Sequence, residues 1–208
     1  MHGISSPTAR RTAAKESFGV ASECIGPITP GMSLFAITRG QFSMIDAILH
    51  TLDCVGPAAV SVWTWTVAEY EVECLKRLQM DGRVTSGRMV IDHGALKKNA
   101  AIILDWKATF GAESVRYVVN HAKLATVSND NYKVLLRGSM NLNRNPRFEQ
   151  LDVTEGGADF DLVKRLEDEL PVLADSVTGK QAYAASRVGE AFDQQELALF
   201  SGIRVWAK

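Results

Sequence analysis

Apolar residues follow two spacings along the first half of the chain, and these spacings predict its secondary structure. Short runs rich in β-branched and aromatic residues, bounded by glycine or proline, indicate strands. The expected strands are Ser33–Thr38, Ala58–Thr66, Arg83–Ile91 and Ser114–Val119. Apolar residues at helical spacing predict helices over Gln41–Leu52, Val67–Gln79 and Lys97–Phe110. This alternation predicts an α/β fold whose first half is a parallel sheet.

The pattern changes in the second half, where two strands follow each other with only a short polar connection. We expect His121–Val127 and Tyr132–Gly138 to form a hairpin, because the residues between them are too few for a helical crossover. Phe160–Leu173 and Gln181–Phe200 have the spacing of helices that close the fold. The fold class predicted is therefore a mixed β-sheet flanked by helices, with the hairpin near its centre.

The first 30 residues show little periodicity and carry Ser, Thr, Gly and Pro. We interpret residues 1–30 as a flexible or loosely packed N-terminal arm, with a short helix near Thr12–Val20. Gly26-Pro27 and Pro30-Gly31 punctuate its end. Residues 31–208 are expected to form one domain, which is an ordinary size for a single hydrophobic core.

Composition and charge narrow the class of protein. Hydrophobic residues make up 46% and charged residues 23%, which is typical of a globular protein, and the formal net charge of −1 provides no overall attraction to nucleic acid. Cys24, Cys54 and Cys74 are odd in number and widely spaced, so we expect reduced thiols and a cytoplasmic location. No apolar run has the length of a signal peptide or a membrane span, and no membrane partner is expected.

Candidate chemistry is concentrated on the hairpin and the residues after it. His121 and Lys123 are two apart, and positions i and i+2 of a strand point to the same face. Ser139 and Asn141 have the same relation after the second strand, and Glu149 follows. A histidine that attacks or donates a proton, a fixed cation and several hydrogen-bond donors suit a phosphate whose oxygens carry negative charge. No cluster with metal-ligand spacing appears, so neither a metal nor another cofactor is expected.

The order of these residues resembles the HKD motif of the phospholipase D superfamily. His121-x-Lys123, then Gly138-Ser139-x-Asn141, then Glu149 is similar to the HxK, GSxN and downstream Glu of that family. The resemblance extends over the strand–helix alternation from residue 33 to residue 155. It implies that His121 is a nucleophile forming a phosphohistidine, that Lys123 and Asn141 bind phosphate with help from Ser139, and that Glu149 positions the histidine.

The chain departs from the family motif at the hairpin turn. Ser128 stands where the family has its aspartate, and the span from Lys123 to Gly138 is three residues longer. Asp130, in the lengthened turn, could partly replace the missing carboxylate. The family uses two such motifs per active site, and this chain has one HxK with one GSxN. The resemblance therefore implies a homodimer in which a twofold axis brings two copies of His121 together.

Several residues around the motif carry a functional and a structural interpretation. Gly138 allows a ligand or another backbone to come close. Arg137, Arg144 and Arg147 could form a local basic rim for substrate, or could be solvated surface residues.

Three further residues have a structural alternative that we favour. His93 could mark a second site at a strand end, or lie in an ordinary polar loop. Trp63 and Trp65 could form a stacking platform for nucleic acid, although packing in the core or an interface is the more common role.

The resulting hypothesis is a metal-independent phosphodiesterase, a nuclease-like hydrolase acting on DNA or RNA, with DNA preferred as the partner. The alternative is a catalytically degenerate protein of the same fold that binds nucleic acid without cleaving it, as in a phage or mobile element. A third alternative is a scaffold in which only the dimer matters.

Overall fold

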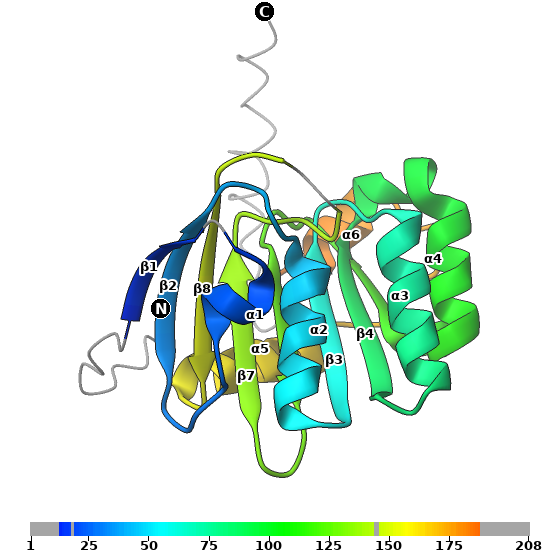
Figure 1. Ribbon diagram of the computed structural model, residues 1–208. Helices are drawn as coiled ribbons and strands as arrows, with labels where there is room; N and C mark the ends of the chain where they lie inside the picture. Colours follow the sequence, from blue (N-terminus) through cyan, green and yellow to red (C-terminus); the bar gives the residue numbers. More distant parts are fainter. Residues whose placement is uncertain (1–12, 18, 144–145, 188–208) are drawn as a thin grey trace, which may run out of the picture.

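The computed structural model describes residues 13–17, 19–143 and 146–187. Its centre is one eight-stranded sheet with the order β1-β2-β8-β7-β6-β3-β4-β5 (Figure 1). The strands are β1 (Ala13–Ser17), β2 (Ser33–Thr38), β3 (Ala58–Thr64), β4 (Val84–Asp92), β5 (Val115–Val118), β6 (Leu124–Ser128), β7 (Lys133–Gly138) and β8 (Glu149–Glu155). The expected α/β class with a mixed sheet flanked by helices is confirmed.

Strand direction divides the sheet into three zones. β3, β4 and β5 are parallel neighbours, as the strand–helix alternation predicted. β6 and β7 form the expected antiparallel hairpin, which occupies the middle of the sheet. β8 then runs antiparallel to both β7 and β2, while β1 pairs parallel with β2 at the edge. The hairpin and β8 together thus join the two parallel zones.

The helices lie on both faces of the sheet. Figure 1 shows α1, α2, α3 and α4 in front of the sheet and α5 behind it. The helices are α1 (Ala21–Ile25), α2 (Met44–Val55), α3 (Glu69–Met80), α4 (Leu96–Phe110), α5 (Ala158–Glu169) and α6 (Gly179–Ala185). Apolar side chains of α1–α4 and of the strands form one continuous core, in which Leu34, Ile48, Leu75 and Trp106 are fully buried. Burial of this surface is the main stabilising contribution to the fold.

Local sequence explains where individual helices begin and end. At the start of α2, the Ser43 backbone N–H donates to Asp46 Oδ2 at 2.8 Å, which is half of a capping box. The same helix ends at Gly56, whose φ of +80° is a conformation that only glycine adopts at low cost. The boundaries therefore follow from short-range chemistry, and they lie close to those expected.

The N-terminal segment differs from the sequence interpretation. Ala13–Ser17 is a strand paired with β2, whereas a short helix near Thr12–Val20 was expected. Ala21, Cys24 and Ile25 of α1 are buried in the core, so residues 19–30 are part of the domain and not a loosely packed arm. An edge strand is held by backbone hydrogen bonds to its neighbour, which apolar periodicity does not reveal. Residues 1–12 and 18 lie outside the described residues.

Three features of the second half also differ from the expected elements. Glu149–Glu155 is a strand, although no strand was expected there. His121 and Lys123 precede β6, which begins at Leu124, so they lie in an irregular segment and not on the strand itself. Of the last expected helix, Gln181–Phe200, only the part up to Ala185 is a described helix, α6, and residues 188–208 lie outside the described part.

Candidate active site

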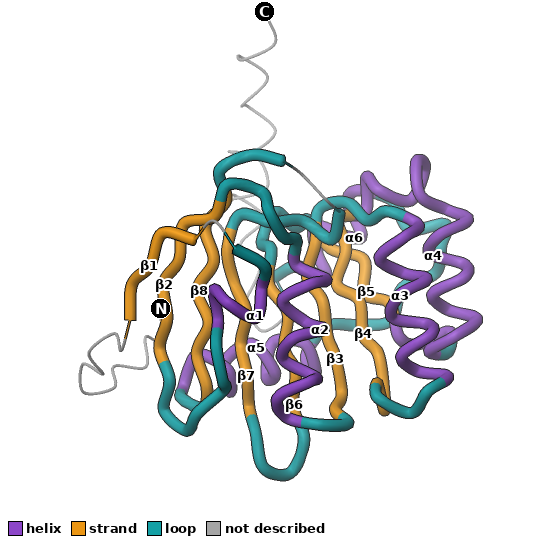
Figure 2. Tube along the Cα trace, viewed as in Figure 1, coloured by secondary structure: helices purple, strands orange, loops and turns teal. Residues whose placement is uncertain are grey.

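All five residues of the motif lie at one end of the strands, and we call this side of the sheet the motif edge. β3, β4 and β5 end at this edge, β6 and β8 begin there, and β7 ends there, so their loops lie together along the top of the tube in Figure 2. His121 and Lys123 directly precede β6. Ser139 and Asn141 directly follow β7, and Glu149 is the first residue of β8. The backbone N–H of Gly138 donates to the carbonyl of Lys123 at 3.0 Å and extends the hairpin ladder up to the motif. In open α/β sheets such an edge is a common place for ligand sites.

His121 and Lys123 form the exposed part of this cluster. Lys123 Nζ lies 3.3 Å from Nδ1 and 3.4 Å from Nε2 of the His121 ring, and it donates to the His121 backbone carbonyl at 2.8 Å. The imidazole is exposed, whereas the lysine is half-buried. Partial burial lowers the pKa of Lys123, and the negative charge of Glu149 opposes that shift. The pair presents an imidazole and a cation to a ligand from outside.

Ser139 and Glu149 form the inner part of the cluster. The Ser139 hydroxyl donates to Glu149 Oε2 and accepts from the backbone N–H of Gln150 at 2.9 Å. Glu149 is only 8% exposed. Within the described residues, no hydrogen bond joins Glu149 to the His121 ring, although the resemblance implied that Glu149 positions it. Ser139 thus holds Glu149 beside Lys123, and the carboxylate acts on the lysine charge.

Gly138 is required by the neighbouring backbone. A Cβ at this position would lie 2.0 Å from the carbonyl oxygen of Gln150 on β8. The close approach anticipated from the sequence is therefore to another strand. It brings the end of β7 against the start of β8, which is what places Ser139 next to Glu149.

Asn141 is oriented by the loop after β3. Its Oδ1 accepts from the backbone N–H of Trp65 at 3.3 Å. Among the described residues no hydrogen bond from its Nδ2 is found, so the amide keeps donors for a ligand oxygen. An amide held in this way is a preorganised donor, the arrangement that stabilises charge on phosphate oxygens.

Asn120 and Asp92 support the site and were not identified from the sequence. Asn120 is buried, and its Nδ2 donates to the carbonyls of Thr64 at 3.0 Å and Ala122 at 3.1 Å. Its Oδ1 accepts from the Ala122 N–H, and its backbone N–H donates to Asp92 Oδ2, each at 3.0 Å. These bonds clamp the segment that carries His121. The only sequence signal was the position of Asn120 directly before His121.

The three arginines expected to form a basic rim, Arg137, Arg144 and Arg147, do not all lie near the cluster in the described structure. Arg137 points toward α5 and pairs with Asp159 at 2.6 Å, so the structure does not bring it to the cluster. Arg147 is exposed, and Gly40 packs directly against its backbone, which places it beside the end of β2. There Arg39 lies over the ring of Phe148, 5.1 Å from its centroid. Arg144 lies outside the described residues.

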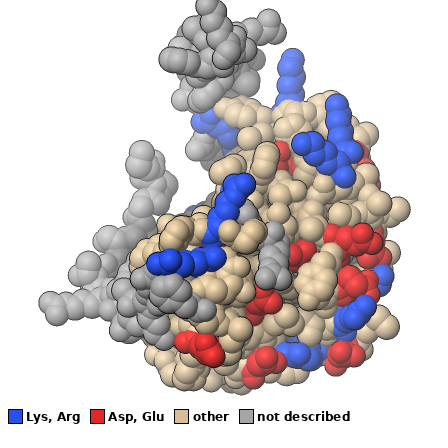
Figure 3. All heavy atoms as spheres, turned by 45° about the horizontal axis from the view of Figure 1, so that its top comes forward, with Lys and Arg blue, Asp and Glu red and all other residues tan. Residues whose placement is uncertain are grey.

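Charges are unevenly spread around this edge. Figure 3 turns the edge toward the viewer and shows mainly Lys and Arg side chains over the upper part and most Asp and Glu side chains below. Lys and Arg side chains thus gather on part of this face although the net charge of the chain is −1. Such a local field attracts a polyanion, which the overall charge does not.

Ser128, which replaces the aspartate of the family motif, lies at the opposite end of β6 from Lys123. β6 begins beside Lys123 and ends at Ser128, about 16 Å away at the usual rise of a strand. In the turn, Asn129 Oδ1 accepts from the N–H groups of Asn131 and Tyr132 at 3.0 Å, and its Nδ2 donates to Val55 O at 2.9 Å. Asp130 is exposed in this remote turn and cannot reach the site. The departure from the family motif therefore lies in the hairpin turn, away from the motif cluster.

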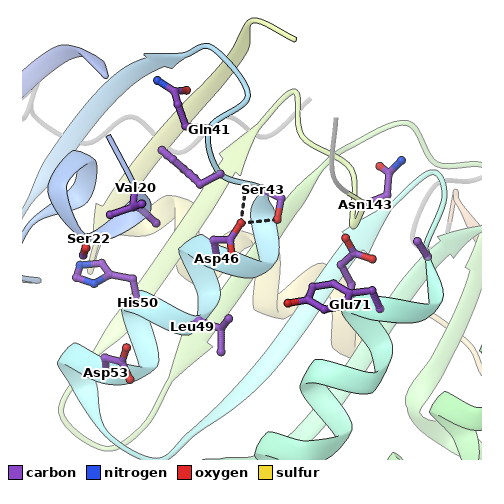
Figure 4. Close-up of a pocket in the computed structure, with 14 residues that line it drawn as sticks. Val20, Ser22, Gln41, Ser43, Asp46, Leu49, His50, Asp53, Glu71 and Asn143 are labelled. Carbon is purple, nitrogen blue, oxygen red and sulfur yellow. Dashed lines mark hydrogen bonds between the residues drawn. The ribbon is translucent and has the colours of Figure 1, made fainter. Parts of the chain in front are cut away.

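A hollow between three helices is a separate feature. It has a volume of about 730 Å³ and lies between α1, α2 and α3 (Figure 4). Figure 4 shows Asp46 turned onto Ser43 at the start of α2, and Asn143 on the rim. None of the five motif residues lines this hollow. The motif cluster therefore lies outside this cavity, which lacks its chemistry.

The remaining candidates from the sequence are Trp63, Trp65 and His93, and they differ in their surroundings. Trp63 donates from Nε1 to the fully buried Glu167 of α5 at 2.8 Å, which agrees with packing. Trp65 is 49% exposed, and its ring centroid lies 6.0 Å from that of His121. His93 lies in the loop after β4, where its Nε2 would be 3.0 Å from a Cβ at Gly179.

In the described part of the chain, no group of three or more His, Cys, Asp or Glu side chains could hold a metal ion. No described helix has the length and apolar character needed to cross a membrane. No protein-family model matches the sequence, and no curated protein matches it at a significant level.

Proposed function

We propose that the chain is a phosphodiesterase that acts on nucleic acid through His121, as a homodimer of the phospholipase D type. The observation that supports this most is the convergence of His121, Lys123 and Asn141 on one open edge of the sheet. They come from segments on both sides of the hairpin, and each presents a group suited to a phosphate. DNA is the preferred substrate over RNA, and nucleic acid is preferred over lipid.

The chemistry assigns one task to each group. A ring nitrogen of His121 attacks phosphorus, the bond from phosphorus to the leaving oxygen breaks, and a phosphohistidine forms. Lys123 Nζ and Asn141 Nδ2 stabilise the charge on the non-bridging oxygens. Water then attacks phosphorus and gives its proton to a second histidine, the N–P bond breaks, and His121 is regenerated.

The leaving oxygen needs a proton, and a second histidine is its source in this proposal. A second copy of the chain would supply its own His121 across a twofold axis. The exposure of His121 is compatible with this. Exposed apolar side chains at the same edge, Val119 and Phe148, would contribute to the contact.

Cleavage of single-stranded DNA in EDTA tests the proposal. The wild type should cleave, and His121→Ala should fall to the background rate because it lacks the nucleophile. His50→Ala is the matched control, since His50 bonds to the Gly26 carbonyl at 2.7 Å, away from the motif. Equal activity of wild type and His121→Ala would rule out a nucleophilic His121.

A binding protein without turnover is the second candidate, and one observation favours it. The Glu149 carboxylate is bonded to Ser139, and among the described residues no carboxylate is hydrogen-bonded to the His121 ring. A ring without such a partner is less well oriented for attack. In this case binding of single-stranded DNA should survive His121→Ala and weaken with Lys123→Ala, with no cleavage by any variant.

A further inference from the structure

Trp65 occupies an unusual position for a large apolar residue. It lies in the bend directly after β3, with its side chain 49% exposed. Its ring centroid is 6.0 Å from that of His121, with the two planes inclined by 49°. The indole therefore flanks the side chain that would attack phosphorus and leaves a surface open to a ligand.

The backbone under this side chain is held on several sides. Besides the bond from the Trp65 N–H to Asn141, the buried Thr64 hydroxyl accepts from the Leu142 N–H at 3.1 Å and donates to the Thr66 carbonyl at 2.5 Å. Asn120 donates to the Thr64 carbonyl at 3.0 Å. The loop is thus tied to the segments that carry both halves of the motif.

Packing does not account for the exposure of this ring. Two residues earlier, Trp63 shows how a tryptophan in this chain is used structurally, with its Nε1 bonded to buried Glu167. Trp65, in the bend after β3, instead stays open to solvent next to the motif. A rigidly based, exposed indole beside a phosphate cluster is the arrangement on which bases stack in proteins that bind single strands.

We infer that Trp65 is a stacking platform for an unpaired nucleobase next to the phosphate held by His121 and Lys123. The inference rests on the proposed function and sharpens it to single-stranded nucleic acid, because the bases of a duplex are already stacked on each other. Stacking is tolerant of sequence, so cleavage should show little base preference. A quaternary ammonium head group would also suit an indole, but the Lys123 ammonium beside His121 repels it.

Two DNA probes separate base stacking from phosphate binding. One is fluorescein-labelled dT12, and the other is a 12-mer with the same backbone and abasic sites, both measured by fluorescence anisotropy in EDTA at low salt. Trp65→Ala should weaken dT12 binding about ten-fold and leave abasic binding unchanged. Trp65→Phe should retain most of the dT12 affinity. Tyr70→Ala is the matched control, because Tyr70 is 69% exposed on α3 and does not line the motif.

The other outcomes each identify a different error. If Trp65→Ala weakens both probes equally, or neither, the ring is not a stacking platform. If light scattering shows that Trp65→Ala changes the oligomeric state, the residue packs between subunits and the inference is overturned. If glycerophosphocholine displaces dT12 from the wild type but not from Trp65→Ala, the ring binds a cation instead.

The proposed function can fail separately. If the wild type binds neither probe, or if Lys123→Ala leaves the binding of both unchanged, the phosphate site itself is wrong and the stacking role falls with it. If Lys123→Ala weakens both probes while Trp65→Ala has no effect, the phosphate site stands and only the stacking role is rejected.

Discussion

The Ser139 hydroxyl lies against Glu149, donating to its Oε2 while accepting from the Gln150 N–H at 2.9 Å. This relationship changes the role expected of the carboxylate. Glu149 is almost buried and its charge acts on Lys123, whereas a direct contact with the His121 ring was expected. Ser139 is in turn a positioning residue, because its hydroxyl is engaged by two groups of β8.

Removal of the Ser139 hydroxyl should destabilise the protein. Ser139→Ala leaves a buried carboxylate without this donor, and we expect a loss of about 1–3 kcal/mol in the free energy of unfolding. Urea unfolding measures it. Ser22→Ala, at an exposed position of α1, should change the same quantity by less than about 0.5 kcal/mol. An equal effect of both changes would show that Ser139 has no special role.

Neutralising Glu149 should move the alkaline limit of binding. The Glu149 charge raises the pKa of Lys123 against the lowering caused by burial, so Glu149→Gln should lower that pKa further. Lys123 then loses its charge at lower pH, and the alkaline fall in DNA affinity should shift downward. Anisotropy measured across pH reports this. Glu155→Gln, at the other end of β8, should leave the limit in place, and a shift to higher pH would contradict the assignment.

Restoring the aspartate of the family motif should not restore or improve activity. Ser128 lies about 16 Å from Lys123 along β6, farther than charges act at ordinary ionic strength. Ser128→Asp should therefore leave kcat/KM for single-stranded DNA within about twofold of the wild type. A much larger change would mean that the hairpin turn communicates with the site.

Asn120 should be essential to the geometry of the site. Asn120→Ala removes the bonds to Thr64 and Ala122 in a buried place, with an expected cost of about 1–3 kcal/mol. Single-stranded DNA cleavage should also fall, because His121 and Trp65 lose their common support. Urea unfolding and cleavage assays measure the two effects. Asn131→Ala, at an exposed turn position, is the control and should affect neither.

Asp175, in the segment after α5, ties that segment to α4 and β5. Its carboxylate accepts hydrogen bonds from Lys107 and, at 2.6 Å, from the Tyr117 hydroxyl. The hydrogen bond from Lys107, followed by that from Tyr117, lowers the pKa of Asp175. The pKa of Tyr117 is raised, mainly by burial. Asp175→Ala should cost about 1–3 kcal/mol at pH 7, because it leaves the Tyr117 hydroxyl without an acceptor.

The pH dependence of this contribution has a definite sign. A carboxylate with a lowered pKa stabilises the fold above its unfolded pKa, and the contribution is lost as the pH falls through the folded pKa. The stability difference between wild type and Asp175→Ala should therefore narrow below about pH 4. Thermal unfolding at pH 7 and pH 3 measures it, with Asp130→Ala as the exposed control. A stability difference between wild type and Asp175→Ala that becomes larger at pH 3 would contradict this assignment.

The sequence by itself determined most of the local structure. Ser33–Thr38 is a strand with the expected bounds, and the helix expected over Lys97–Phe110 begins only one residue earlier. The hairpin was predictable because four polar residues cannot cross over a sheet. Short-range terms decide these features, namely apolar periodicity, glycine conformation and turn length. The residue types of the candidate cluster and their order were also readable from the chain.

Only the tertiary structure decided how these pieces meet. Insertion of β8 between β2 and β7 joins residues more than a hundred positions apart, which no local pattern encodes. That pairing places Glu149 against Ser139, while α5 takes Arg137 away to Asp159. The exposure of Trp65 and the clamp made by Asn120 likewise depend on several distant segments packing together. The physical reason is that contacts between distant strands are set by the burial of the whole core, whereas sequence spacing reports only on neighbours along the chain.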